Sequence, residues 1–204
     1  MWVQTHTPML FINFLCGQLD NGGDHEDPHH KCERYTSCVC MFNRAVATFS
    51  APSNPCNIDG MCNEVIWAAP SWLKGMPHYD CVFINSNNDL HSMHRMEVAQ
   101  AICFFSFTHL DITYPCVLVH WFSHITEELD ESTGMWMVTP DFDDEGSPNL
   151  TVIHIDCIFC AAHLIPIFRD LFVPDHITLD NSLDYFKGFY INHFVDHHAF
   201  SIAS

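Results

Sequence analysis

The chain has 204 residues, a hydrophobic fraction of 48% and a formal net charge of -18, from 25 acidic and 7 basic residues. This length and apolar content predict one folded domain of ordinary size and exclude a largely disordered chain. No Lys or Arg lies between Arg95 and Arg169. Because a duplex-binding surface needs clustered cations to displace counterions from phosphate, we do not expect direct nucleic-acid binding.

The cysteine pattern bears on the compartment. The 11 Cys residues are odd in number and lack a disulfide-scaffold layout, which predicts free thiols in an intracellular, reducing environment. Residues 8–16 form an apolar run that no positive charge precedes and that is too short to span a bilayer. We therefore expect neither a secretion signal nor a membrane segment.

Two regions follow from the pattern along the chain. Residues 1–44 have no clear period and include a Gly/Asp/His/Pro loop at residues 21–30. We expect them to form a poorly ordered or non-homologous N-terminal arm. Residues 45–204 are predicted to form one domain.

Strands dominate the predicted domain, because short runs of β-branched and aromatic residues alternate with turn signals. In chain order, strands are expected at residues 45–49, 64–69, 79–85, 96–108, 114–122, 135–138 and 150–155. A period of two places Cys103, Phe105 and Phe107 on one face of their strand. In the next strand it separates two sets of side chains: Val117, Val119 and Trp121 on one face, and Cys116, Leu118 and His120 on the other.

Two helices are expected near the C-terminus. Residues 157–165 permit a short helix that ends before Pro166. Residues 180–200 read as an amphipathic helix, although Gly188 inside it costs about 1 kcal/mol relative to Ala. Its apolar stripe contains Leu183, Phe186, Tyr190 and Phe194.

The fold class is therefore mainly β with minor α. A meander of short strands and one terminal helix predict a small, partly open SH3-like or BAH-like barrel, capped by the C-terminal amphipathic helix.

Several sequence segments, taken in their order along the chain, carry a family resemblance. They are APSNPCNIDGM, APSWLKGMPHYDCV, MEVAQAICFFSF, ITYPCVLVHWF, DESTGMWMV, VIHIDCIFCAAHLIP and SLDYFKGFYINHFVDHHAF. In this order they resemble the C-terminal region of fungal Plavaka-type transposon proteins, which are transposase-like. The resemblance covers residues 45–203.

The resemblance implies a nuclear accessory region, in a solo or decayed copy. The family's chemistry is expected in an upstream RNase H-like core with acidic metal ligands, and no part of this chain matches such a core. Cys160 stands where the family pattern has Arg, and His193 stands where it has Lys.

Metal binding is the alternative to an interaction role, because 16 His accompany the 11 Cys. His29, His30, Cys32, Cys38 and Cys40 lie close in sequence. Their thiol spacing, C-x5-C-x-C, is not that of a usual zinc knuckle. Cys56 and Cys62 have a similar spacing and are equally weak candidates for zinc ligands.

A second metal candidate is a histidine pair. His193 and His197 are four residues apart and would share one face of the predicted helix. No Glu follows the first His, unlike in H-E-x-x-H. For His197 and His198, the structural alternative is a helix end with one ring buried and hydrogen-bonded.

Acidic residues cluster in two predicted loops. They are Asp130, Glu131, Asp141, Asp143, Asp144 and Glu145. Carboxylate pairs can hold Mg²⁺ for phosphoryl chemistry, but such sites need rigid elements. In loops rich in Gly and Pro we expect a solvated surface.

No nucleophile arrangement is recognisable. The sequence has no G-x-S-x-G elbow and no Gly-rich phosphate loop. Cys116 and His120 would share a strand face but stand too far apart for a hydrogen bond. We therefore expect no enzymatic activity and no cofactor, with zinc as the alternative.

The leading hypothesis is a non-catalytic interaction module whose partner is another protein or a transposase core. Aromatic residues near the barrel mouth, Trp121, Phe122 and Trp136, are the candidates for partner binding. Packing in the core is the competing role for Trp121 and Trp136. The acidic loops would suit a basic peptide.

Overall fold

The computed structural model describes residues 38–50, 61–71, 75–85, 96–168, 177, 182–195 and 199–200. Strands make up most of this part of the chain. They are β1 (Cys40–Phe42), β2 (Arg44–Ser50), β3 (Met61–Ala69), β4 (His78–Tyr79), β5 (Cys81–Asn85), β6 (Met96–His109), β7 (Ile112–His124), β8 (Met137–Pro140), β9 (Leu150–His154), β10 (Ile158–Ala162), β11 (Leu164–Pro166) and β12 (Phe189–Ile191). Two short helical segments accompany them, the 3₁₀ turn η4 (Ile155–Cys157) and α2 (Ser182–Tyr185).

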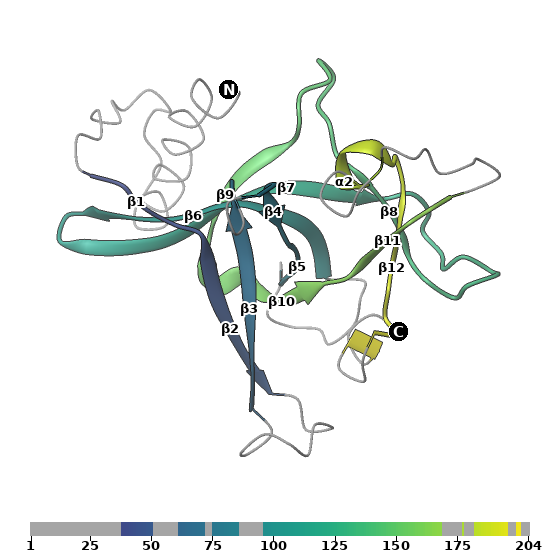
Figure 1. The fold of residues 1–204 in the computed structure, drawn as a ribbon, viewed down its shortest axis with the longest axis horizontal. Helices are drawn as coiled ribbons and strands as arrows, with labels where there is room; N and C mark the ends of the chain where they lie inside the picture. The colour runs from purple at the N-terminus through teal and green to yellow at the C-terminus, as the bar shows by residue number, and fades with distance from the viewer. Residues whose placement is uncertain are drawn as a thin grey trace, which may run out of the picture.

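The long β6–β7 hairpin is the centre of the main sheet (Figure 1). Each of its outer edges is shared by two strands. On β6, β5 pairs with residues 96–100 and β1 with residues 104–106. On β7, β9 pairs with residues 116–120 and β8 with residues 122–124. The sheet continues from β8 to β12 and β11.

One segment, β9–η4–β10, nearly closes this sheet into a barrel. β9 pairs with β7 from Cys116 to His120, and β10 pairs with β5 on the far side of the hairpin. Between them, η4 turns the chain, and the His154 ring accepts a hydrogen bond from the Asp156 amide at 3.3 Å. The two edges that would otherwise stay open are thus joined by consecutive residues, which removes most of the exposed sheet edge.

A β-bulge in β6 decides which side chains face the barrel interior. Ala101 pairs with Val119, whereas Cys103 pairs with Leu118, so two steps on β6 match one step on β7. Because side chains alternate along a strand, the extra residue reverses the parity of β6 beyond it. Ala99 and Ala101 face the interior before the bulge, and Phe104 does so after it.

The barrel interior is a packed apolar core rather than a channel. Its buried members come from β3, β5, β6 and β7: Ile66, Ala68, Val82, Ile84, Ala99, Ala101, Phe104, Val117 and Val119. Ile153 and Ile155 pack against them, as the alternation in the sequence predicts, while the His154 side chain lies on the opposite face of β9. At about 25 cal/mol for each Å² of apolar surface removed from water, burial of this kind is the main stabilising term.

Two further apolar clusters lie on the outer face of the barrel. The first joins β5, β6 and β10 to β8 and β12, with Phe83, Phe122, Trp136 and Phe189 among its members. The second covers the distal half of the hairpin and includes Phe105, Phe107, Cys116, Leu118 and Val152. The face shared by Cys103, Phe105 and Phe107 is therefore confirmed.

A small sheet, β2–β3–β4, packs across the barrel and is joined to it by Asp80. The Trp67 amide donates a hydrogen bond of 2.7 Å to the Asp80 carboxylate, and the Asp80 amide donates to the Trp67 carbonyl. The Asp80 carbonyl in turn accepts from the Ala101 amide at 2.9 Å, beside the bulge. One residue thus connects β3 with β6.

The structure confirms the mainly β class, the nearly closed barrel and the seven predicted strand regions, with shifted ends. Within the described residues, no helix is long and apolar enough to cross a membrane. Residues 40–42, which belong to the predicted N-terminal arm, form β1, whereas residues 1–37 lie outside the described part of the chain.

The two predicted helices are wrong. Residues 158–162 and 164–166 are strands, because Ile158–Ala162 completes the barrel against β5. In the C-terminal segment, helix is described at Ser182–Tyr185 and at residues 199–200, and Phe189–Ile191 is a strand between β8 and β11. Gly188 precedes that strand, and a Cβ atom there would lie 3.2 Å from the Ile125 side chain. Tight packing, rather than helix geometry, accounts for this glycine.

The hairpin turn between β6 and β7 gives a prediction. Leu110 and Asp111 both have positive φ, 49° and 63°, and the flanking residues His109 and Ile112 are paired. This is the geometry of a type I′ turn, which favours Asn-Gly, and a Leu in the left-handed region costs about 1 kcal/mol. Replacing both residues, Leu110→Asn with Asp111→Gly, is expected to raise the free energy of unfolding by about 1 kcal/mol in urea denaturation.

The matched control is Leu110→Val with Asp111 retained, which places a β-branched residue at positive φ and should destabilise the protein. An unchanged or lower stability of the Asn-Gly variant contradicts the assigned turn.

Candidate functional site

A groove of about 710 Å³ lies on the outer face of the barrel. It lies between the two outer apolar clusters, since Phe122 and Phe186 belong to the first and Ile102 and Leu150 to the second. The groove is lined from β6, β7, β8, the β8–β9 loop, β9 and α2 by Gln100, Ile102, His120, Phe122, Thr139, Pro140, Phe142, Pro148, Leu150, Leu183, Tyr185, Phe186 and Lys187.

One wall of the groove is the loop between β8 and β9, which projects from the barrel (Figure 1). Its neck is held where β7 changes partner from β9 to β8. The Trp121 amide donates to the Asn149 carbonyl at 3.1 Å, and the Asp141 amide donates to the Trp121 carbonyl at 2.9 Å. The Asn149 side-chain amide also donates to the Asp141 carboxylate at 2.7 Å. The neck is therefore fixed to β7, and the rest of the loop extends outward.

His120 joins this neck to the floor of the groove. Its Nε2 lies 2.8 Å from the Asp141 carbonyl oxygen, which can only accept, so Nε2 carries the proton. The Phe142 ring stands edge-on to the imidazole, with ring centroids 5.5 Å apart and an interplanar angle of 74°. Neutral His120 consequently keeps Nδ1 as a hydrogen-bond acceptor.

Gln100 lies directly across the hairpin from His120, as its register partner on β6. Both side chains are half-buried and line the groove. Within the described residues, the Gln100 side-chain amide and His120 Nδ1 have no hydrogen-bond partner. The floor of a mostly apolar groove thus includes one side-chain amide and one imidazole.

The opposite wall comes from α2 and the residues after it. The Thr139 hydroxyl donates to the Lys187 carbonyl at 2.7 Å and ties this segment to β8. Tyr185 and Phe186 stand edge-to-face, with centroids 5.5 Å apart, and Tyr185 is 47% exposed. Two exposed rings, Tyr185 and the 54%-exposed Phe142, therefore come from opposite walls.

The three predicted partner-binding residues are separated by the fold. Phe122 lines the groove while its ring packs edge-to-face on Phe189. Trp121 packs against the barrel interior, and Trp136 is only 8% exposed in the first outer cluster, beside His124. Of the three, Phe122 alone lines this groove, and partner binding by any of them stays a prediction.

The sequence did not indicate Gln100, Phe142 or Lys187 as site residues. The hairpin turn alone would not have found Gln100, because a register counted from residues 110 and 111 pairs His120 with Ala101, and the bulge shifts this pairing by one residue to Gln100. Phe142 had a signal in the sequence, because it is an aromatic residue inside an acidic loop. Lys187 was hidden by the helix predicted for residues 180–200.

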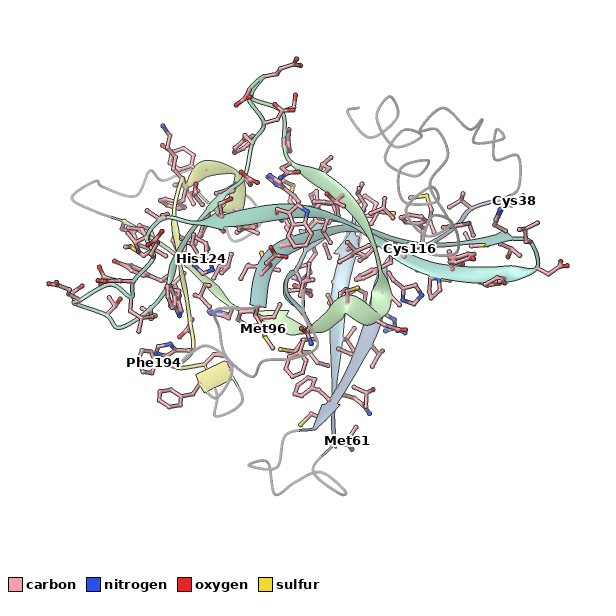
Figure 2. The ribbon with its side chains drawn as sticks, turned by 180° about the vertical axis from the view of Figure 1, so that it is seen from behind. Cys38, Met61, Met96, Cys116, His124 and Phe194 are labelled. Atoms are coloured by element: carbon pink, nitrogen blue, oxygen red, sulfur yellow. The ribbon has the colours of Figure 1, made fainter. Side chains whose placement is uncertain are left out.

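The proposed metal ligands are not brought together in the described part of the chain. No group of three or more His, Cys, Asp or Glu side chains there has metal-binding geometry. Cys38 and Cys40 are exposed at the β1 end, far from Phe194 and its neighbour His193 (Figure 2). His29, His30, Cys32, Cys56 and His197 lie outside the described residues.

His193 is buried, with 4% of its surface exposed, and packs edge-on against Phe194 and Phe200. It follows a strand rather than standing on a helix, so the four-residue helical spacing expected for His193 and His197 is wrong as a geometric premise.

Two carboxylates of the acidic set hold turns. The Asp143 side chain accepts hydrogen bonds from the Glu145 and Ser147 amides at 3.0 and 2.7 Å. Asp130 accepts from the amides and hydroxyls of Ser132 and Thr133. Hydrogen bonds from the Ser132 and Thr133 side chains lower the Asp130 pKa below its ordinary value.

The thiols of the barrel behave as small apolar side chains. Burial raises the pKa of Cys116 to about 12 and also raises the pKa values of Cys81 and Cys103. The Cys116 thiol donates to the Tyr114 carbonyl at 3.7 Å, while His120 is bonded to Asp141. Cys116 and His120 are therefore engaged with different partners, and a thiol that holds its proton is a poor nucleophile.

Comparison with known proteins gave no match for this chain, whether to a family model, to a curated protein or to a solved structure.

The acidic loop supports a matched pair of variants. Because Asp143 accepts two backbone hydrogen bonds and Asp144 is exposed in the same loop, Asp143→Ala is expected to lower the free energy of unfolding by about 1 kcal/mol. Asp144→Ala should change it by less than about 0.5 kcal/mol. Both values are measured by urea denaturation. Equal effects of the two substitutions contradict the turn-holding role of Asp143.

Proposed function

We propose that this chain is a non-catalytic interaction module that binds a Lys/Arg-rich segment of a partner protein across the groove. The main observation that supports this proposal is the groove itself, about 710 Å³ in volume, with aromatic side chains on both walls. Exposed aromatic rings around a concave, mostly apolar surface are typical of binding sites.

Charge favours a basic partner. The β8–β9 loop that forms one wall carries Asp143, Asp144 and Glu145, all exposed. No Lys or Arg lies between Arg95 and Arg169. The cation that lines the groove within the described residues, Lys187, comes from the α2 side. A bound segment would therefore place its basic residues toward the loop, where like charges are absent and opposite charges steer association.

A role without catalysis agrees with the chemistry described. The buried thiols hold their protons, and Asp130 and Asp143 are occupied as turn acceptors. The resemblance to the C-terminal region of Plavaka-type transposon proteins points the same way, since the chemistry of that family is expected in another domain. In this proposal the partner is a transposase core or another nuclear protein, and the chain is a solo or decayed accessory copy.

The test is a titration of a fluorescein-labelled peptide, with Lys and Arg flanking one aromatic residue, followed by fluorescence anisotropy. Affinity is expected to fall by roughly tenfold or more between about 0.02 M and about 0.3 M salt, because screening shortens the reach of the acidic loop. A peptide of the same length with Glu in place of each basic residue should not bind.

Two charge-reversal variants give opposite expected effects. Asp144→Lys should weaken binding several-fold, whereas Lys187→Glu should strengthen it, because the first removes and the second adds attraction for a basic segment. Neither exposed side chain has a role in the core. Absence of peptide binding at low salt, with a folded protein, overturns the proposed function.

A further inference from the structure

The groove has a chemical feature that a purely apolar, acidic-rimmed surface lacks. Two polar side chains, Gln100 and His120, are register partners on neighbouring strands and both line the groove. Both are half-buried. Polar groups that are partly desolvated and unpaired favour a ligand that pairs with them.

The proton on His120 decides what the imidazole can accept. Because the Asp141 carbonyl holds the proton on Nε2 at 2.8 Å, Nδ1 of the neutral ring is an acceptor. The same bond ties the ring to the loop neck, so the acceptor is held in place rather than free to turn. A bound group must therefore bring a donor, such as N–H or O–H.

The walls of the groove favour a ligand whose donor is attached to a flat, apolar ring. Phe122, Phe142, Tyr185 and Phe186 line the groove, and Pro140 and Pro148 add further apolar surface. Edge-to-face pairs such as His120–Phe142 and Tyr185–Phe186 show that rings here already meet at steep angles. An additional aromatic ring would fit this arrangement.

We propose that the anchor of the bound segment is a tryptophan side chain, whose indole N–H donates to His120 Nδ1 and whose ring packs between Phe142 and Tyr185. Indole joins a large apolar ring to a single donor. Gln100 supplies a second polar contact, to the backbone of the bound segment. This inference rests on the proposed function, since the tryptophan sits in the same basic segment.

The experiment compares two peptides that differ in one atom group. One is a Lys/Arg-flanked peptide with a single tryptophan, and the other has 2-naphthylalanine in its place, a fused bicyclic aromatic of similar size that lacks the N–H. The tryptophan peptide is expected to bind the native protein about tenfold more tightly in anisotropy titrations, as one well-formed hydrogen bond implies.

Two variants test the assignment to residues. His120→Phe keeps a ring but removes the acceptor, and should bring the ratio of the two affinities close to one. Gln100→Leu leaves the loop neck intact; it should weaken both peptides similarly and preserve the ratio. An amide ¹H–¹⁵N spectrum checks that each variant is folded, and the two-peptide comparison on the native protein does not depend on either variant.

The outcomes separate the two proposals. Equal or tighter binding of the naphthylalanine peptide overturns the tryptophan anchor while leaving the interaction module in place. A tyrosine or phenylalanine peptide that binds more tightly than the tryptophan peptide also overturns it. Failure of all basic aromatic peptides to bind overturns the proposed function itself.

Discussion

The pairing of β9 and β10 with two different strands is the constraint on which the structure depends. β9 adds to β7 and β10 adds to β5, and only the three residues of η4 separate them. Because η4 joins β9 directly to β10, the outer edges of β5 and β7 cannot move apart without breaking one of these two pairings. The interior side chains, among them Val82 and Val119, pack against Ile155 and the flanking residues of the segment that joins the two pairings.

The groove is a consequence of this closure. β9 ends its pairing at His120 and β8 begins at Phe122, which leaves Trp121 to bind the neck of the acidic loop. The loop is thereby held over the outer face, where His120 contacts both the neck and Phe142. A barrel built from the same strands without this change of partner would have no wall at that position.

Much of the barrel could be predicted from the sequence because its strands alternate cleanly. Val117 and Val119 face inward and Cys116 and Leu118 outward, as a period of two requires. The bulge near Ala101 left no comparable signal, since the run around it is apolar on both faces. Its effect on Phe104 depends on pairing with β7, which the sequence of β6 does not contain.

The helix predicted for the C-terminal segment is wrong for a related reason. Leu183, Phe186, Tyr190 and Phe194 recur at helical spacing, but Phe194 is 62% exposed while Phe189 and Ile191 are fully buried. Partners on both sides, β8 and β11, select the strand. The same error concealed Lys187 and Tyr185 as walls of the groove, whereas Phe122 could be named because it lies on a strand whose pattern was clear.

The most direct test of the account is a set of backbone NOEs in isotopically labelled protein. The structure predicts cross-strand NOEs between Val117 and Ile153 together with NOEs between Val82 and Ala161. Observing both sets in one folded state supports a barrel closed through η4. NOEs of a continuous helix across residues 157–165, or β9 contacts without those from β10 to β5, would contradict it.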